Sequence, residues 1–124
     1  MSYKMIFCLR RRADLDEAEF SRYWRDEHAE LFRRYAQTLG VRRYTQNHRL
    51  ATPVNDGLRR FRGAPDGYDG VAEVWFDSLE GLLAALGSPA GRAAAADLIA
   101  DERNFIDHER SPIWIAQESE IGLP

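Results

Sequence analysis

The sequence predicts an α+β protein with the ferredoxin-like element order β-α-β-β-α-β. Two observations carry this prediction: short apolar segments alternate with two helical regions, and those regions have clear start signals. In this plan the four strands form one antiparallel sheet and both helices cover the same face of it. The length of 124 residues suits a single domain, which we place at residues 1–118 with a patternless tail at 119–124.

The first strand and the first helix are marked by composition and by capping residues. Tyr3–Leu9 is a short, almost wholly apolar run, typical of a strand that is buried on both faces. Asp16 is a favourable N-cap residue, and Glu19 supplies the acidic half of a capping box. Gly40 can adopt a left-handed conformation, so we expect the helix to run from Asp16 to Leu39.

The first helix carries an aromatic stripe that contains a histidine. On a helical wheel the stripe falls within roughly 80° of arc and consists of Phe20, Trp24, His28, Leu31 and Tyr35. This is the buried face of an amphipathic helix. His28 is therefore either a core histidine that hydrogen-bonds the backbone or a group poised for proton transfer.

The second and third strands frame a long connection. Val41–Leu50 is expected to be a strand with one side formed by Tyr44, Gln46, His48 and Leu50. The segment 51–69 is rich in Pro and Gly and shows little periodicity, so we predict an irregular loop. Gly70–Phe76 is the third strand, with one face formed by Val71, Glu73 and Trp75.

The second helical region is split in two. A short helix is predicted near Ser78–Leu86. Ser88 and Pro89 then form a cap followed by a first-turn proline, and this second helix is expected to continue towards Asp107. The fourth strand is predicted at Ser111–Glu118.

One face of such a sheet has no helix to cover it. The apolar and aromatic side chains of that face would remain in water at a cost of roughly 25 cal/mol per Å². A second copy of the chain is the simplest cover, so the sequence predicts a homodimer whose sheets meet face to face and enclose a pocket in each subunit.

Composition and motifs exclude several classes of function. The net charge of −3 and the pI of about 5.6 provide no basic field for nucleic acid. No segment approaches the ~20 apolar residues of a membrane span, and no signal peptide is recognisable, so we expect a cytoplasmic protein without a membrane partner. The sequence also lacks metal-ligand spacing and nucleotide-binding glycine motifs, so no metal and no cofactor are predicted.

Several short motifs resemble one known family. They are Tyr23-Trp24 with His28, Asn47-His48, the run Tyr68–Phe76, Asp101-Glu102, and Phe105-Ile106-Asp107. The chain resembles EthD-type proteins of the dimeric α+β barrel superfamily. The resemblance implies a small cytoplasmic dimer related to cofactor-free monooxygenases, lactone isomerases, and polyketide cyclases or dehydratases. Where such proteins have Ala-Pro-Leu after the histidine, this chain has Ala29-Glu30-Leu31, and Glu30 should let the helix continue regularly.

We assign two candidate catalytic residues and four candidate binding residues. His28 would transfer protons, and Glu73 would act as acid or base, or orient the substrate, in the face covered by the dimer. The alternative for Glu73 is a salt bridge to an arginine. Trp24, Tyr44, His48 and Trp75 would bind the substrate, although His48 could be plain surface and Tyr44 plain packing.

Three functional hypotheses follow. The first is a dimeric enzyme that acts on an apolar, oxygenated small molecule by cofactor-independent oxygenation, dehydration or isomerisation. The second is a non-catalytic accessory or carrier that holds such a molecule for an oxidative or biosynthetic pathway. The third is a structural dimer with a filled interior.

Overall fold

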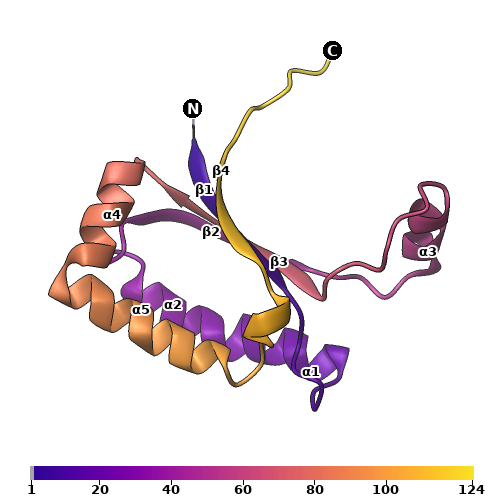
Figure 1. The fold of residues 1–124 in the computed structure, drawn as a ribbon, viewed down its shortest axis with the longest axis horizontal. Helices are drawn as coiled ribbons and strands as arrows, with labels where there is room; N and C mark the ends of the chain where they lie inside the picture. The colour runs from indigo at the N-terminus through magenta and orange to yellow at the C-terminus, as the bar shows by residue number, and fades with distance from the viewer. Residues whose placement is uncertain (1) are drawn as a thin grey trace.

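The computed structural model describes residues 2–124 (Figure 1). The elements in chain order are β1 (Tyr3–Leu9), α1 (Glu17–Arg22), the π-helix η1 (Tyr23–His28), α2 (Ala29–Tyr35), β2 (Val41–His48), α3 (Pro53–Arg60), β3 (Gly70–Phe76), α4 (Leu79–Gly87), α5 (Pro89–Glu102), the 3₁₀ turn η2 (His108–Arg110) and β4 (Ile113–Gln117).

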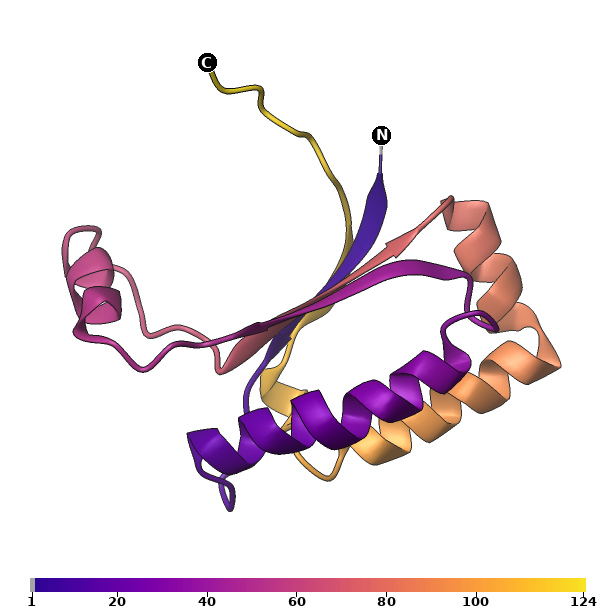
Figure 2. The ribbon, with the colours of Figure 1, turned by 180° about the vertical axis from the view of Figure 1, so that it is seen from behind.

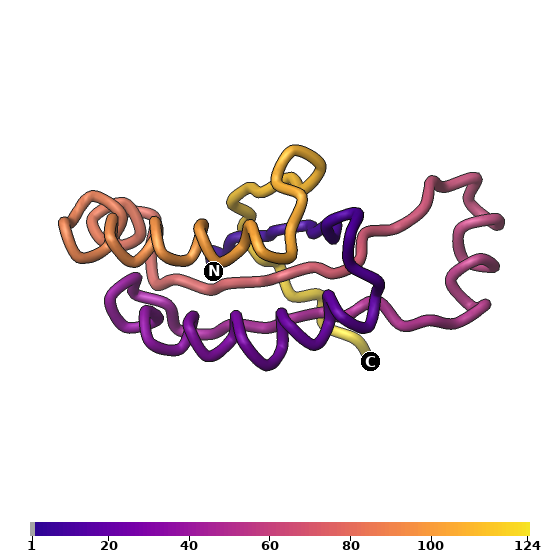
Figure 3. Tube along the Cα trace, turned by 90° about the horizontal axis from the view of Figure 1, so that it is seen from below, coloured from indigo at the N-terminus to yellow at the C-terminus, as the bar shows by residue number. Residues whose placement is uncertain are grey.

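The four strands form one antiparallel sheet in the order β2-β3-β1-β4. The composite helix α1–η1–α2 and helix α5 lie side by side beneath one face of the sheet and run in opposite directions (Figures 1, 2 and 3). None of the described helices covers the opposite face. The predicted α+β, ferredoxin-like plan is therefore confirmed.

The strand register fixes which side chains face the helices. Tyr3 pairs with Phe76 and Leu9 pairs with Gly70, so alternate residues of β1 and β3 turn towards the same side. The helix-covered side holds Met5, Phe7 and Leu9 of β1 with Ala72, Val74 and Phe76 of β3. The buried core lies between this side of the sheet and the aromatic stripe of the first helix.

The first helix begins as predicted but is not regular. The carboxylate of Asp16 accepts a hydrogen bond from the backbone N–H of Glu19 at 2.8 Å. The backbone then widens into a π-helix that ends at His28, so the prediction of a regular helix around this residue is wrong. The helix ends at Tyr35 rather than Leu39, and the turn closes through Gly40 at a φ of +69°.

Helices α4 and α5 begin close to their predicted starts, and the predicted cap at Ser88 is present. Ser78 caps α4 and Ser88 caps α5, each by accepting a hydrogen bond from a backbone N–H three residues later. Helix α5 ends at Glu102, five residues before the expected end at Asp107. The chain then turns sharply through η2 into β4, which is shorter than predicted at both ends.

The connection between β2 and β3 contains a helix that the sequence analysis did not predict. Thr52 caps α3 by accepting a hydrogen bond from Val54, and Pro53 occupies the first turn. The segment 49–68, which we call the arm, leaves the end of the sheet and projects away from the body (Figures 1 and 3). The prediction of an irregular loop at 51–69 is wrong for Pro53–Arg60.

Gly70 allows the first helix to approach the sheet closely. A Cβ atom at this position would lie 2.4 Å from the indole carbon Cζ3 of Trp24 and 3.1 Å from the backbone oxygen of Asn47. Trp24 is itself fully buried. A glycine at the start of β3 therefore sets the depth at which the aromatic stripe packs.

Candidate functional site

A cavity of about 220 Å³ lies between the helix-covered side of the sheet and the helices. Its lining is almost wholly apolar. Among the described residues, those with polar side-chain groups that line it are Trp24, His28, Tyr44 and Glu102. The remaining lining residues include Met5, Phe7, Leu9, Phe32, Val41, Val74, Leu98 and Ile113. The cavity can therefore hold an apolar molecule and offers few positions for its polar atoms.

His28 lines this cavity and is fixed by a carboxylate behind it. The imidazole is buried at the end of the π-helix, and its Nδ1 lies 2.7 Å from Oδ2 of Asp101 on α5. The ring of Phe105 lies against it, with 5.0 Å between the ring centroids. The histidine is thus held in one orientation by an ionisable partner and an aromatic wall.

Asp101 is held in turn by groups that stabilise its charged form. The Tyr23 hydroxyl donates to its Oδ1 at 2.6 Å, and the Asn104 amide donates to the same oxygen at 3.3 Å. Burial alone would raise the pKa of Asp101, but the hydrogen bonds from Tyr23 and His28 outweigh it, and the pKa is lowered. Burial and the Asp101 contact raise the pKa of Tyr23 to about 12, so it remains a donor.

This network fixes the tautomer of the histidine. An ionised Asp101 can only accept a hydrogen bond, so Nδ1 of His28 must carry the proton. In the neutral form of the ring, the lone pair is then at Nε2. Within residues 2–124 no hydrogen bond reaches Nε2, yet no buried side-chain nitrogen or oxygen lacks a partner. Nε2 therefore has access to the cavity and can accept a proton there.

Tyr44 brings a hydroxyl proton to the same cavity. Its oxygen accepts hydrogen bonds from Nε1 of Trp24 at 3.1 Å and from Nε2 of Gln46 at 2.9 Å. Burial raises the pKa of Tyr44 to about 12, so the hydroxyl stays protonated. None of the described groups accepts that proton. Tyr44 can therefore donate a hydrogen bond to a bound oxygen atom.

Gln46 ties the π-helix to the sheet. Its Nε2 also donates to the backbone oxygen of Trp24 at 2.9 Å. That oxygen already accepts the N–H of Ala29, five residues later, which defines the π-turn. Such turns are common at functional sites because they shift side chains away from the regular helical spacing. Here the turn and its clamp set the position of His28.

His48 lies behind the site rather than in it. Its ring packs on Trp24, with 4.6 Å between centroids, and its nitrogens contact Ser21 and the Gln46 oxygen. Burial, together with the nearby Arg25, lowers the pKa of His48. The residue is not among those that line the cavity, so its predicted contact with a ligand has no counterpart in the protomer.

Glu73 and Trp75 lie on the opposite face of the sheet. Glu73 accepts hydrogen bonds from Lys4 at 3.0 Å and from Asn47 at 3.2 Å, so its ion-pair partner is a lysine and not an arginine. Trp75 lies between the cationic groups of Lys4 and Arg43. The sheet separates both residues from His28, so the expectation of one pocket lined by Trp24, His28, Tyr44, Glu73 and Trp75 is wrong for the protomer.

Asp101, Tyr23 and Glu102 were recognised in the sequence only as parts of the family resemblance and not as site residues. Asn104 was not recognised at all. A signal for the two acids was available. Asp101 and Glu102 end α5, where the helix dipole disfavours negative charge, and the last turn has no basic residue. Each acid holds a different histidine: Asp101 holds His28, and Glu102 pairs with Nε2 of His108 at 2.9 Å. His108 is thus paired with a carboxylate as well.

Residues 2–124 contain no group of three or more His, Cys, Asp or Glu side chains placed to hold a metal ion. No helix in this part of the chain is both long and apolar enough to cross a membrane.

Comparison with known proteins places the chain in a family. It matches the solved structure of an EthD family protein from Bacillus halodurans C-125, with 19% identity and a TM-score of 0.64, over 96% of this chain and 100% of that chain. It also matches a dimeric protein of unknown function with a ferredoxin-like fold from Bacteroides fragilis, with 12% identity and a TM-score of 0.57, over 94% of this chain and 96% of that chain. A third match is SnoaB, a cofactor-independent oxygenase from Streptomyces nogalater, with 15% identity and a TM-score of 0.51, over 97% of this chain and 93% of that chain. No curated protein matches the sequence. Because the EthD domain model matches residues 12–109, most of its length, the chain belongs to the EthD domain family.

Proposed function

We propose that this protein is a homodimeric enzyme that transfers protons on an apolar, oxygenated small molecule bound between its sheet and its helices. The observation that carries the proposal is the position of His28. A carboxylate fixes one of its ring nitrogens, and the other reaches an apolar cavity.

The arrangement supports a simple sequence of proton transfers. Nε2 of His28 accepts a proton from an acidic C–H or O–H group of the substrate, and the imidazolium that forms is stabilised by Asp101. The charge that develops on the substrate oxygen is stabilised by the hydroxyl of Tyr44. Return of the proton to another atom gives isomerisation, and its return to a leaving hydroxyl gives dehydration.

The cavity restricts the size and polarity of the substrate. An apolar cavity of about 150 Å³ holds a molecule such as benzene, so about 220 Å³ accommodates a substrate of one or two small rings. The exposed rim consists of Leu86, Ile99 and Ile113. A molecule with an apolar skeleton and one or two oxygen atoms fits both the lining and the rim.

Oxygenation without a cofactor is a further reaction of this class. SnoaB, whose fold this chain shares, is a cofactor-independent oxygenase. Removal of a proton from a phenol or enol by His28 would give an electron-rich anion that can react with O₂ as co-substrate. The three reactions share the same first step, and that step is the core of the proposal.

The homodimer is proposed from the uncovered face of the sheet. Ile6, Val71 and Trp114 lie on this face, and Trp114 is 46% exposed. Burying such a surface against a second copy is favourable. The ferredoxin-like protein from Bacteroides fragilis is itself dimeric, which supports the same assembly here. Glu73 and Trp75 would then lie in the interface region, apart from the cavity.

A carrier is the second candidate, favoured by the nearly complete apolar lining of the cavity. In this case the chain would hold its ligand for a partner enzyme without changing it. A filled, purely structural interior is disfavoured by the cavity beside His28. Native mass spectrometry of the freshly purified protein would show a retained small molecule if the carrier function is correct.

The first proton transfer can be tested without knowing the natural substrate. In D₂O, 2-tetralone takes up deuterium at its acidic C–H positions, and proton NMR follows the exchange. Wild-type protein should accelerate this exchange over buffer, and His28→Ala should lose about 100-fold or more of the acceleration. His48→Ala is the matched control and should retain it. Binding of 2-tetralone without acceleration would support the carrier and contradict the enzyme.

A further inference from the structure

Helix α3 exposes its apolar side to solvent. Val54, Leu58 and Phe61 follow the spacing i, i+4, i+7 and therefore lie on one side of the helix and its C-terminal cap. Their exposed fractions are 63%, 53% and 92%. Leu50, at the base of the arm, is exposed as well. In an ordinary surface helix this side would be buried.

The polar groups of the arm bond to one another. The Asn55 amide donates to the backbone oxygen of Leu50 at 2.7 Å, and Arg59 pairs with Asp56, one turn earlier on the same helix, at 3.1 Å. At the base of the arm, Arg49 pairs with Asp66 at 2.9 Å. These polar groups therefore have partners within the arm, whereas Val54 and Phe61 remain exposed to solvent.

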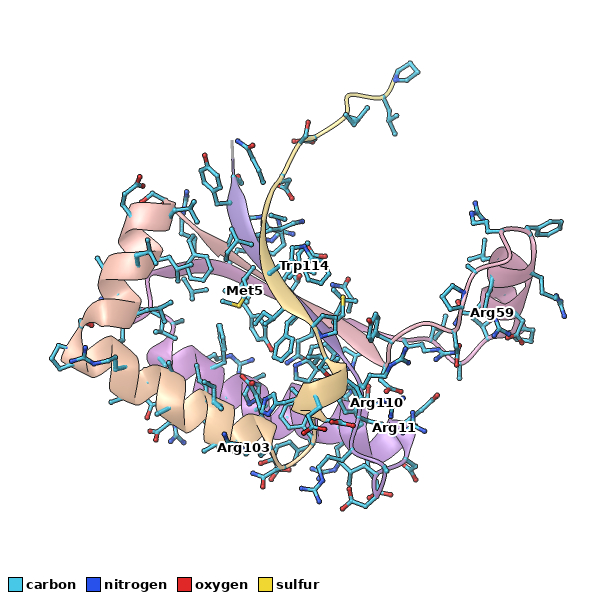
Figure 4. All side chains as sticks on the ribbon, viewed as in Figure 1. Met5, Arg11, Arg59, Arg103, Arg110 and Trp114 are labelled. Atoms are coloured by element: carbon cyan, nitrogen blue, oxygen red, sulfur yellow. The ribbon has the colours of Figure 1, made fainter. Side chains whose placement is uncertain are left out.

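No part of residues 2–124 of the same protomer covers this apolar side. The arm continues past the ends of β2 and β3 and projects from the body, on the side away from α4 (Figures 1 and 2). Arg59 on the arm lies far from the helices beneath the sheet (Figure 4). The cover for Val54, Leu58 and Phe61 must therefore come from another molecule.

The charge of the arm differs from that of the body. Residues 49–68 contain four arginines and two aspartates, a net charge of +2. The whole chain has a net charge of −3, so the residues outside the arm have a net charge of −5. A basic, apolar arm and an acidic body are complementary between two copies of the same chain.

From these observations we infer that the arm clasps the body of a second copy of this chain, with Val54, Leu58 and Phe61 buried against it. The inference rests on the homodimer proposed above and extends that interface beyond the sheet. In a two-fold assembly both arms would act in the same way, because the same patches meet twice. A sheet contact alone would leave both apolar sides in water.

An anionic membrane is a weaker explanation for the same surface. The helix has only eight residues, and Arg49 and Arg59 are already paired with aspartates. A body with a net charge of −5 would be repelled by anionic lipid. A second copy of the chain would bury the apolar side of the arm and would also attract the basic arm through its negative net charge.

A photo-crosslinking amino acid at position 61 tests the contact directly. With p-benzoylphenylalanine in place of Phe61, irradiation of the purified full chain should give a covalent species of twice 14.2 kDa. Peptide mapping should place the crosslink on the body of the other copy. The same probe at Leu83, an exposed position on α4, is the control and should give little dimer.

Substitution tests the contribution of the arm to assembly. Leu58→Asp combined with Phe61→Asp should weaken the dimer about 100-fold in native mass spectrometry or analytical ultracentrifugation. Leu83→Asp, which changes a more exposed leucine outside the arm, should leave the dimer unchanged.

Each outcome decides a separate point. A wild-type dimer that gives no crosslink at position 61 and survives the arm substitutions would overturn the role of the arm and leave the dimer standing. A monomeric wild type at micromolar concentration would overturn both. Binding to phosphatidylserine vesicles that disappears in the arm variant, without a crosslinked dimer, would assign the arm to a membrane surface and overturn the inference.

Discussion

The contact between His28 and Asp101 determines what the histidine can do. The carboxylate fixes the proton on Nδ1 and leaves the lone pair of Nε2 facing the cavity. Tyr23 and Asn104 hold the carboxylate from behind. Asp101, Tyr23 and Asn104 thus act together to orient the ring of His28, and of these four residues only His28 contacts the proposed substrate.

Asp101→Asn should reverse the tautomer of His28. A carboxamide can present its N–H₂ to Nδ1, which then becomes the acceptor and moves the ring proton to Nε2. We expect ¹⁵N NMR at neutral pH to show Nδ1–H in the wild type and Nε2–H in the variant. Deuterium uptake by 2-tetralone should fall about 100-fold, while the affinity for 2-tetralone stays within about twofold because the cavity lining is unchanged. An unaltered tautomer with lost activity would contradict this role for Asp101.

The sequence predicted the histidine but not its partner, for a physical reason. His28 follows from local spacing, because its neighbours in the stripe lie within one or two turns of the same helix. Asp101 lies 73 residues away, and the packing of α5 against η1 brings the two together. Local patterns carry no information on such a contact. The unfavourable placement of two acids at the end of α5 was the one available hint.

At the scale of elements, the strands and caps were the most predictable features. The boundaries of β1 and β3, the caps Asp16 and Ser88, and the start of α4 after Ser78 agree with the sequence analysis, because they depend on short-range patterns. Helix α3 was missed although Val54, Leu58 and Phe61 carry helical spacing. Gly57 in its middle and the flanking Pro and Gly residues are typical of a loop, and its apolar side contributes nothing to the core of its own protomer.

Alternation identified the two sides of each strand but not which side the helices cover. Tyr44, Gln46 and His48 do share one side of β2, and all three contact the first helix. Glu73 and Trp75 share one side of β3, which turns out to be the other side of the sheet. Assigning them to the same pocket as His28 required knowledge of the three-dimensional packing.

The corner between α4 and α5 gives a prediction at this scale. A Cβ atom at Gly91 would lie 1.7 Å from the backbone oxygen of Ala85, so the corner must open to admit it. Gly91→Ala should destabilise the protein by about 3 kcal/mol in urea unfolding. Gly87→Ala, where nothing lies within 4 Å of the new atom, is the matched control and should change stability by less than about 1 kcal/mol. Equal stability of the two variants would contradict the close packing of this corner.

At the scale of the whole molecule, two of the apolar surfaces that the protomer leaves exposed are proposed to meet a second copy. One is the sheet face with Trp114, and the other is the apolar side of the arm. Two copies that bury both surfaces would couple the folding of each chain to assembly. The stability of the protein should then depend on its concentration.

Thermal unfolding tests this coupling. The Tm of the wild type should rise by several degrees when the protein concentration is raised about 100-fold, because only the assembled state buries these surfaces. Trp114→Arg, which places a charge on the uncovered sheet face, should lower the Tm and remove its dependence on concentration. Differential scanning calorimetry at two or three concentrations measures both effects. A wild-type Tm that does not change with concentration would argue against the dimer.

The π-turn at Tyr23–His28 makes the number of residues in this helix matter. Deleting one residue there would return the backbone to the ordinary α-helical pitch and move the ring of His28 from the position that the wider turn gives it. The imidazole could not then face both α5 and the cavity. Among sequences that keep the same chemistry, alignment gaps should therefore be absent between these positions. Gaps should instead occur in the connection after β2, where the number of residues does not determine the orientation of the His28 ring.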